Sequence, residues 1–167
     1  MIVACASINR FATSIRKPQT HKTPMQIEKR ETELKLEQLD VLDKLYGDLF
    51  FAQQHQDVRK SGQPDVSLSG LHSTTWWEYK HATPRFSSPG IQENTCARLA
   101  ARSFCRYIIY FETPCIFSTW IVHPLEVKDK RGIMNLIHPE WIFPGFAHDK
   151  VAEYMKRTHD DLVRTRR

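Results

Sequence analysis

The chain has 167 residues, of which 41% are hydrophobic and 11% aromatic, so it is long and apolar enough to bury one compact core. Its formal net charge is +5, but residues 1–24 contain four basic residues and no acid, which leaves a net charge of only +1 for the rest of the chain. This distribution disfavours a strongly cationic protein that coats duplex nucleic acid. It is compatible with an enzyme that keeps several carboxylates inside a locally basic groove.

The cysteines and the N-terminal segment bear on location. The four cysteines, Cys5, Cys96, Cys105 and Cys115, contain no CxxC pair and no Cys/His spacing of a structural zinc site, so we expect reduced thiols that lie mostly in the core. No run approaches the ~20 apolar residues of a membrane span, and the N-terminus lacks the apolar block of a secretory signal. We therefore expect a cytoplasmic protein with no membrane association.

The acid-free start at residues 1–24 is expected to be a disordered tail, or sequence upstream of a true start near Met25. A mitochondrial presequence is the alternative for this segment. The eight histidines form no HxxxH pair and no zinc or HNH-like spacing, so we expect them to be structural or solvated.

The first predicted element is an amphipathic helix from Gln26 to about Phe50, because leucines at positions 34, 39, 42, 45 and 49 recur at helical spacing. At 100° per residue, Glu31 falls on the same side as Leu42 and Leu45, whereas Glu33 points the opposite way. One acidic side chain of this helix should therefore face inward. The alternative is that Glu31 stays solvated in the first turns, where the helix dipole favours an acid.

Short strands and two further helices follow in the sequence. Val66 and Leu68 alternate with small polar residues in one strand, and Thr74–Lys80, rich in Thr, Trp and Tyr, forms the next, so the two predict a hairpin. The other expected elements are a strand within 49–56, a helix at 91–104, strands at 107–111 and 116–122, a loop-like segment at 124–146 and a final helix at 148–163.

This order predicts a single mixed α/β domain. We expect a tail at 1–24, a core at 25–123, and a C-terminal extension at 124–167 whose terminal helix packs on the core.

The predicted hairpin brings together residues suited to phosphodiester hydrolysis. That reaction needs a hard divalent cation held by carboxylate oxygens that converge from different elements. Asp65 and Glu78 should stand side by side at one end of the hairpin, and Lys80 should emerge on the same face as Glu78, because side chains alternate along a strand. A lysine there can orient the attacking water or offset charge that develops on the phosphate.

The pattern Pro64-Asp65, a short gap, then Glu78-Tyr79-Lys80 resembles the PD-(D/E)XK signature of restriction-endonuclease-like nucleases. The resemblance covers about residues 28–122 and extends to Gly62-Gln63, to an acid on the preceding helix and to Gly90-Ile91-Gln92, which together look like the virus-type replication-repair (VRR-NUC) branch. It implies a restriction-endonuclease-like α/β fold with a mixed central sheet flanked by helices. It also implies a nuclease that uses Mg²⁺, with Mn²⁺ as a substitute.

The resemblance implies a role for each matching residue. Asp65 and Glu78 would bind the metal, Lys80 would orient the water or act as an electrostatic partner, and Gln92 would contact the metal's water or the scissile phosphate. Glu31 would complete the acidic cluster as a third metal ligand, with Glu33 and Glu37 as rivals for that position. A set of basic residues flanks the proposed site in sequence and would contact nucleic acid: Arg59, Lys60, His81, Arg85, Arg98 and Arg102.

Each of these motifs also has a structural explanation. Pro64-Asp65 is a common turn pair, and Glu78 with Lys80 is a common cross-strand charge couple. Gln92 could simply cap its helix, and any single basic residue could be ordinary surface charge. Trp76 is more often a core residue than a platform for base stacking.

Three functions are compatible with these residues. The first is a structure-specific endonuclease acting on branched, flapped or junction DNA in replication, recombination or repair, a specificity that the family resemblance alone implies. The second is an exonuclease or restriction-type nuclease on the same fold, and the third is a non-catalytic module that binds nucleic acid. DNA is the expected partner, and a homodimer is possible.

Overall fold

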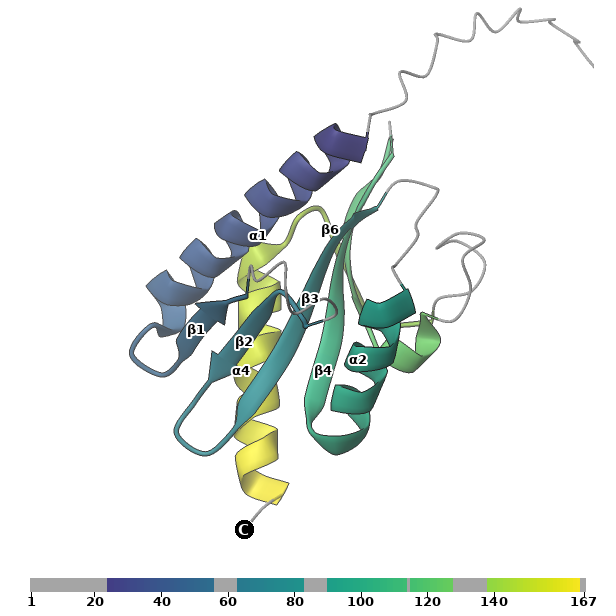
Figure 1. The fold of residues 1–167 in the computed structure, drawn as a ribbon. Helices are drawn as coiled ribbons and strands as arrows, with labels where there is room; N and C mark the ends of the chain where they lie inside the picture. Colours follow the sequence, from purple (N-terminus) through teal and green to yellow (C-terminus); the bar gives the residue numbers. More distant parts are fainter. Residues whose placement is uncertain (1–23, 56–62, 83–89, 114, 128–137, 166–167) are drawn as a thin grey trace, which may run out of the picture.

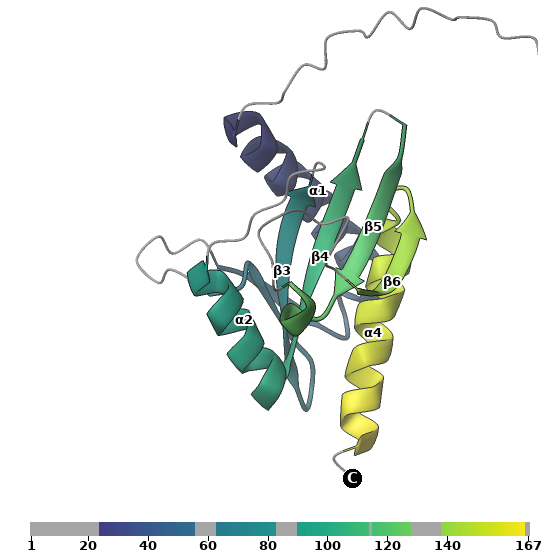
Figure 2. The same cartoon turned by 90° about the vertical axis from the view of Figure 1, so that its right-hand side faces the viewer.

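A computed structural model of the chain describes residues 24–55, 63–82, 90–113, 115–127 and 138–165. Within these ranges a six-stranded sheet has the strand order β1-β2-β3-β4-β5-β6, and helices cover both of its faces (Figures 1 and 2). The elements in chain order are α1 Pro24–Tyr46, β1 Phe51–Gln54, β2 Val66–Ser69, β3 Thr74–Ala82, α2 Gly90–Arg102, β4 Phe104–Glu112, β5 Phe117–Val122, η1 Pro124–Glu126, β6 Pro139–Pro144 and α4 His148–Thr165. The predicted mixed α/β class and the single domain are confirmed.

The sheet is antiparallel except at its centre, where β3 and β4 run parallel. Two parallel neighbours cannot be joined by a tight turn, and α2 makes the crossover between them. The predicted hairpin is the β2–β3 pair, in which Val66 lies opposite Trp77 and Leu68 opposite Thr75. Side chains on β3 therefore alternate between the two faces of the sheet.

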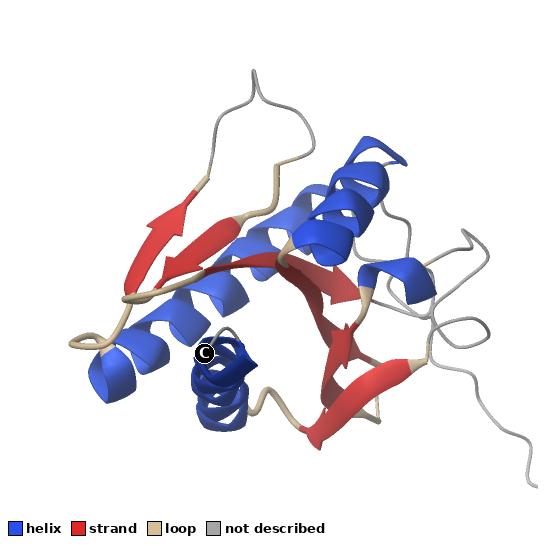
Figure 3. Ribbon diagram, turned by 90° about the horizontal axis from the view of Figure 1, so that it is seen from below, coloured by secondary structure: helices blue, strands red, loops and turns tan. Residues whose placement is uncertain are grey.

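Each face of the sheet has its own apolar core. On one face, Trp77 and Tyr79 of β3 pack with residues of α1 and α4, among them Leu34 and Met155. Figure 3 shows the sheet curving around α4 on this side. On the other face, Ala82 of β3 packs with Cys96 of α2 and with alternate residues of β4, and Trp76 lies against this second core. Because side chains alternate along a strand, Glu78 and Lys80 lie on the same face of the sheet as Trp76 and Ala82.

Residues 124–146, predicted as a loop, instead contain the short helix η1 and the edge strand β6. The prediction was wrong because it weighed Pro139 and Pro144 above the apolar run between them. Proline lacks the N–H that a ladder needs, but it is tolerated at the ends of an edge strand, and both prolines are terminal residues of β6.

Two helix boundaries also differ from the prediction. Helix α1 ends at Tyr46, and Leu45 and Leu49 are exposed rather than inward-facing. Phe104, predicted as the last residue of the second helix, is instead the first residue of β4.

The described part of the chain includes no helix that combines the length and the hydropathy needed to cross a membrane.

Candidate functional site

The open end of the β2–β3 hairpin holds Asp65 and Glu78 in a reciprocal arrangement. The backbone N–H of Asp65 donates a hydrogen bond to Glu78 Oε2 at 3.1 Å, and the N–H of Tyr79 donates to Asp65 Oδ2 at 2.9 Å. Each carboxylate thus has one oxygen fixed by the backbone of the other strand. The structure brings these two predicted site residues together as neighbours, with the second oxygen of each directed elsewhere.

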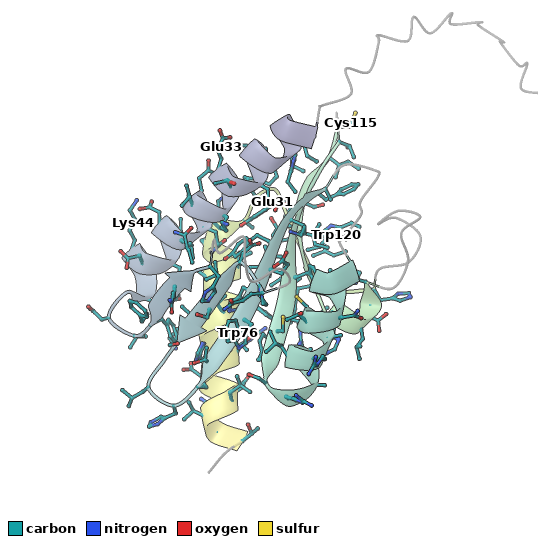
Figure 4. All side chains as sticks on the ribbon, in the orientation of Figure 1. Glu31, Glu33, Lys44, Trp76, Cys115 and Trp120 are labelled. Atoms are coloured by element: carbon teal, nitrogen blue, oxygen red, sulfur yellow. The ribbon has the colours of Figure 1, made fainter. Side chains whose placement is uncertain are left out.

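Strand β3 continues past the start of β2, and α1 reaches the edge that is left open. There the N–H of His81 donates to Glu31 Oε2 at 3.0 Å, and Lys80 Nζ donates to Glu31 Oε1 at 3.3 Å. Glu31 is therefore the helix acid at this site, as the wheel predicted. Figure 4 shows Glu31 on the sheet side of α1 and Glu33 on its outer side.

The two rival acids of α1 have other partners. Glu33 lies 3.5 Å from Arg30, and Glu37 lies 3.3 Å from His148 at the start of α4. Neither is an acidic neighbour of Lys80, whose ion pairs in the described residues are with Glu31 and Glu78.

The lysine of the motif lies between two carboxylates. Lys80 Nζ is 2.7 Å from Glu78 Oε1, and the Glu78 side chain is fully buried. Burial lowers the pKa of Lys80, but the carboxylates of Glu78, Glu31 and Asp65 outweigh it and hold that pKa above its ordinary value. The ammonium therefore stays charged.

The Lys80 ammonium keeps its charge, but desolvation disfavours the charged form of the Glu78 carboxyl. Burial raises the pKa of Glu78 from 4.5 to about 7, with the Asp65 charge adding to this and the Lys80 ammonium partly offsetting it. Burial likewise raises the pKa of Glu31, against the influence of Lys80 and of the His81 N–H. The site thus holds two carboxyl groups that ionise less readily than usual next to a permanent cation.

A second lysine at the site was missed in the sequence. Lys35 of α1 is buried, and its Nζ lies 3.6 Å from Asp65 Oδ1. It follows Glu31 by four residues, so the same wheel that turned Glu31 inward also turns Lys35 inward. The helical spacing thus indicates the inward position, but the residue type argues against it, because a lysine is rarely buried unless it is paired.

The carboxylates at this site supply oxygen ligands of the kind that a hard divalent cation such as Mg²⁺ prefers. In the described residues no three His, Cys, Asp or Glu side chains form a group that could hold a metal ion. Mg²⁺ is commonly held by one or two carboxylates, with water and substrate phosphate completing its octahedron. Backbone N–H groups bind Glu78 Oε2 and Asp65 Oδ2. The candidate donors are therefore the other two oxygens, Glu78 Oε1 with Lys80 Nζ at 2.7 Å and Asp65 Oδ1 with Lys35 Nζ at 3.6 Å.

Of the remaining predicted residues, Arg98, Arg102 and His81 have described side chains. Gln92 lies in the first turn of α2, and its side chain is outside the described residues, as are Arg59, Lys60 and Arg85. Arg98 and Arg102 are exposed on α2. His81 is buried, with Nε2 2.8 Å from Glu112 Oε2, so its side chain does not lie at the surface where a phosphate would bind.

No protein-family model matches this chain, and the comparison with curated proteins gives no significant match. The geometry of the hairpin end and the motif that it carries are therefore the basis for inferring the function.

The raised pKa of Glu78 predicts a pH dependence of stability in metal-free buffer. Between pH 4.5 and about 7 the folded protein binds a proton at Glu78 more tightly than the unfolded chain does. This contribution is complete below pH 4.5 and is lost as the pH rises through 7. Relative to Glu78→Gln, the wild-type free energy of unfolding should fall by about 3 kcal/mol across this range.

Denaturant unfolding of both proteins from pH 4 to pH 8, with a chelator present, measures this difference. Glu33→Gln is the matched control, because it removes a carboxylate from the outer side of α1 and should track the wild type. If the free energies of unfolding of the wild type and of Glu78→Gln change in parallel with pH over the whole range, the burial of an ionisable Glu78 is contradicted.

Proposed function

We propose that this protein is a Mg²⁺-dependent endodeoxyribonuclease of the PD-(D/E)XK type, related to the VRR-NUC branch, that hydrolyses phosphodiester bonds in branched, flapped or junction DNA. The observation that carries the proposal is the reciprocal bonding of Asp65 and Glu78, which fixes both carboxylates at the hairpin end, where the Lys80 ammonium lies 2.7 Å from Glu78 Oε1. A mixed sheet with helices on both faces is the architecture that the resemblance implies. A bacterial or phage cytoplasm is the proposed setting.

Asp65 and Glu78 would hold the cation through Oδ1 and Oε1. When bound, the ion supplies positive charge that polarises the scissile phosphate and lowers the pKa of the attacking water. The backbone N–H groups of Asp65 and Tyr79 keep the other oxygen of each carboxylate in place, so the donors are oriented before the ion arrives. At neutral pH part of the protein must first lose the Glu78 proton, so binding should be stronger at higher pH.

Lys80 and Glu31 have separate tasks in this scheme. The Lys80 ammonium is a point charge on a flexible stem, suited to orienting the water or to stabilising charge on the phosphate. Glu31 holds Lys80 Nζ on one side and caps the His81 N–H with its other oxygen. We assign Glu31 to positioning Lys80, because both of its carboxylate oxygens accept hydrogen bonds from β3.

Cleavage of labelled DNA tests the proposal. Duplex, flap and four-way junction substrates should be cut with Mg²⁺ or Mn²⁺ and not with a chelator, and the branched substrates should be preferred. Asp65→Asn and Lys80→Met should each lower the rate at least about 100-fold, because each removes charge from the reacting centre. Asn keeps the acceptor for the Tyr79 N–H, and Met keeps the apolar stem of Lys80.

The controls for cleavage are Glu33→Gln and Lys44→Met, at a half-buried and an exposed position of the same helix, and both variants should retain full activity. Circular dichroism confirms that each variant is folded. Full activity in both site variants would end the nuclease mechanism as drawn. Release of mononucleotides from one end would favour an exonuclease, and metal-independent binding without cleavage would favour a non-catalytic module.

Salt dependence tests the proposed DNA surface on α2. For Asp65→Asn, the logarithm of DNA affinity should fall linearly with the logarithm of salt concentration. Arg98→Ala and Arg102→Ala should each reduce this slope by about 0.9 if the arginine contacts one phosphate. Arg157→Ala, on α4 across the sheet from α2, is the matched control and should leave the slope unchanged. A flat salt response would contradict a DNA groove.

A further inference from the structure

Lys35 is a buried charge for which the proposed reaction has no use. Its side chain runs from α1 to the hairpin end, where Nζ lies 3.6 Å from Asp65 Oδ1. Neighbouring inward positions of α1 hold Leu34 and Leu42, which belong to the apolar core. A leucine or methionine at position 35 would avoid the desolvation of an ammonium, so this lysine needs an explanation beyond packing.

Helix α1 delivers two opposite charges to the same place. Glu31 contacts Lys80 on β3, and Lys35, four residues later, contacts Asp65 just before β2. The cluster therefore contains three carboxylates, those of Glu31, Asp65 and Glu78, and two ammonium groups. When all five groups are ionised, the formal charge of the cluster is −1.

The net charge of the cluster changes when ligands bind. A bound divalent cation raises the net charge to +1, and a phosphodiester, which carries one negative charge, then brings it to zero. Without Lys35, the net charge of the metal-free cluster would be −2 and that of the metal-loaded cluster would be zero. It would attract the cation more strongly and would have no remaining net charge with which to attract the phosphate.

We propose that Lys35 sets the charge of this cluster, so that the metal-loaded site attracts a phosphodiester at the expense of metal affinity. The inference rests on the proposed nuclease function and deepens it. Lys35 acts through Asp65, so it is a positioning residue and not a catalytic one. The two ammonium groups lie next to the carboxylate oxygens that face away from the backbone N–H donors: Lys80 Nζ is 2.7 Å from Glu78 Oε1, and Lys35 Nζ is 3.6 Å from Asp65 Oδ1.

The test measures two affinities that should move in opposite directions. Mn²⁺ binding without DNA is measured by electron paramagnetic resonance of the free ion, and KM and kcat for flap DNA are measured at saturating Mn²⁺. Lys35→Met should bind Mn²⁺ about tenfold more tightly and should show a KM raised about tenfold, with kcat changed less than threefold. Lys35→Arg keeps the charge and should stay within about threefold of the wild type in each quantity.

Lys44→Met is the matched control, because Lys44 lies on the same helix but is exposed and pairs with Asp40. If Lys35→Met does not fold, Lys35→Gln supplies the neutral variant. Weaker Mn²⁺ binding together with a raised KM, or no change in either, would overturn this inference while leaving the nuclease intact. A wild-type protein that neither binds Mn²⁺ nor cuts DNA would overturn both proposals.

Discussion

The site depends on a difference in length between two paired strands. Strand β3 has nine residues and β2 has four, so the edge of β3 continues where β2 is absent. Its N–H groups at Tyr79 and His81 then need acceptors, because an unpaired N–H in a buried place is costly. The carboxylates of Asp65 and Glu31 accept these two bonds. The same geometry that completes the backbone pairing therefore brings acidic side chains from a loop and a helix to one point.

Burying these acids is energetically costly. Removing Glu78 from water raises its pKa to about 7, and a buried carboxylate is tolerated only when charged partners and hydrogen bonds compensate. Lys80 and Lys35 supply that compensation, each near the carboxylate oxygen that the backbone leaves available. In a purely structural cluster these lysines would be the final partners. In a nuclease, they would hold the carboxylates until a divalent cation binds there, followed by the substrate phosphate.

Much of this arrangement was predictable because it depends on local periodicity. The alternation of Val66 and Leu68 set the register that makes Asp65 and Glu78 neighbours, and the helical period turned Glu31 inward. Strand β6 was not predictable in the same way, because it forms by pairing with β5 and its prolines resemble a loop locally. Lys35 is less obvious in the sequence, because helical spacing places it on the inward side but only its tertiary contact with Asp65 shows why a lysine is buried there.

The most direct measurement is the anomalous scattering of Mn²⁺ in crystals of the protein. The account predicts one strong peak bound by Asp65 and Glu78 at about 2.1 Å from an oxygen of each, with Lys80 beside it. A peak at another place, or intact contacts of Lys80 with Glu78 and of Lys35 with Asp65 at saturating Mn²⁺, would contradict it.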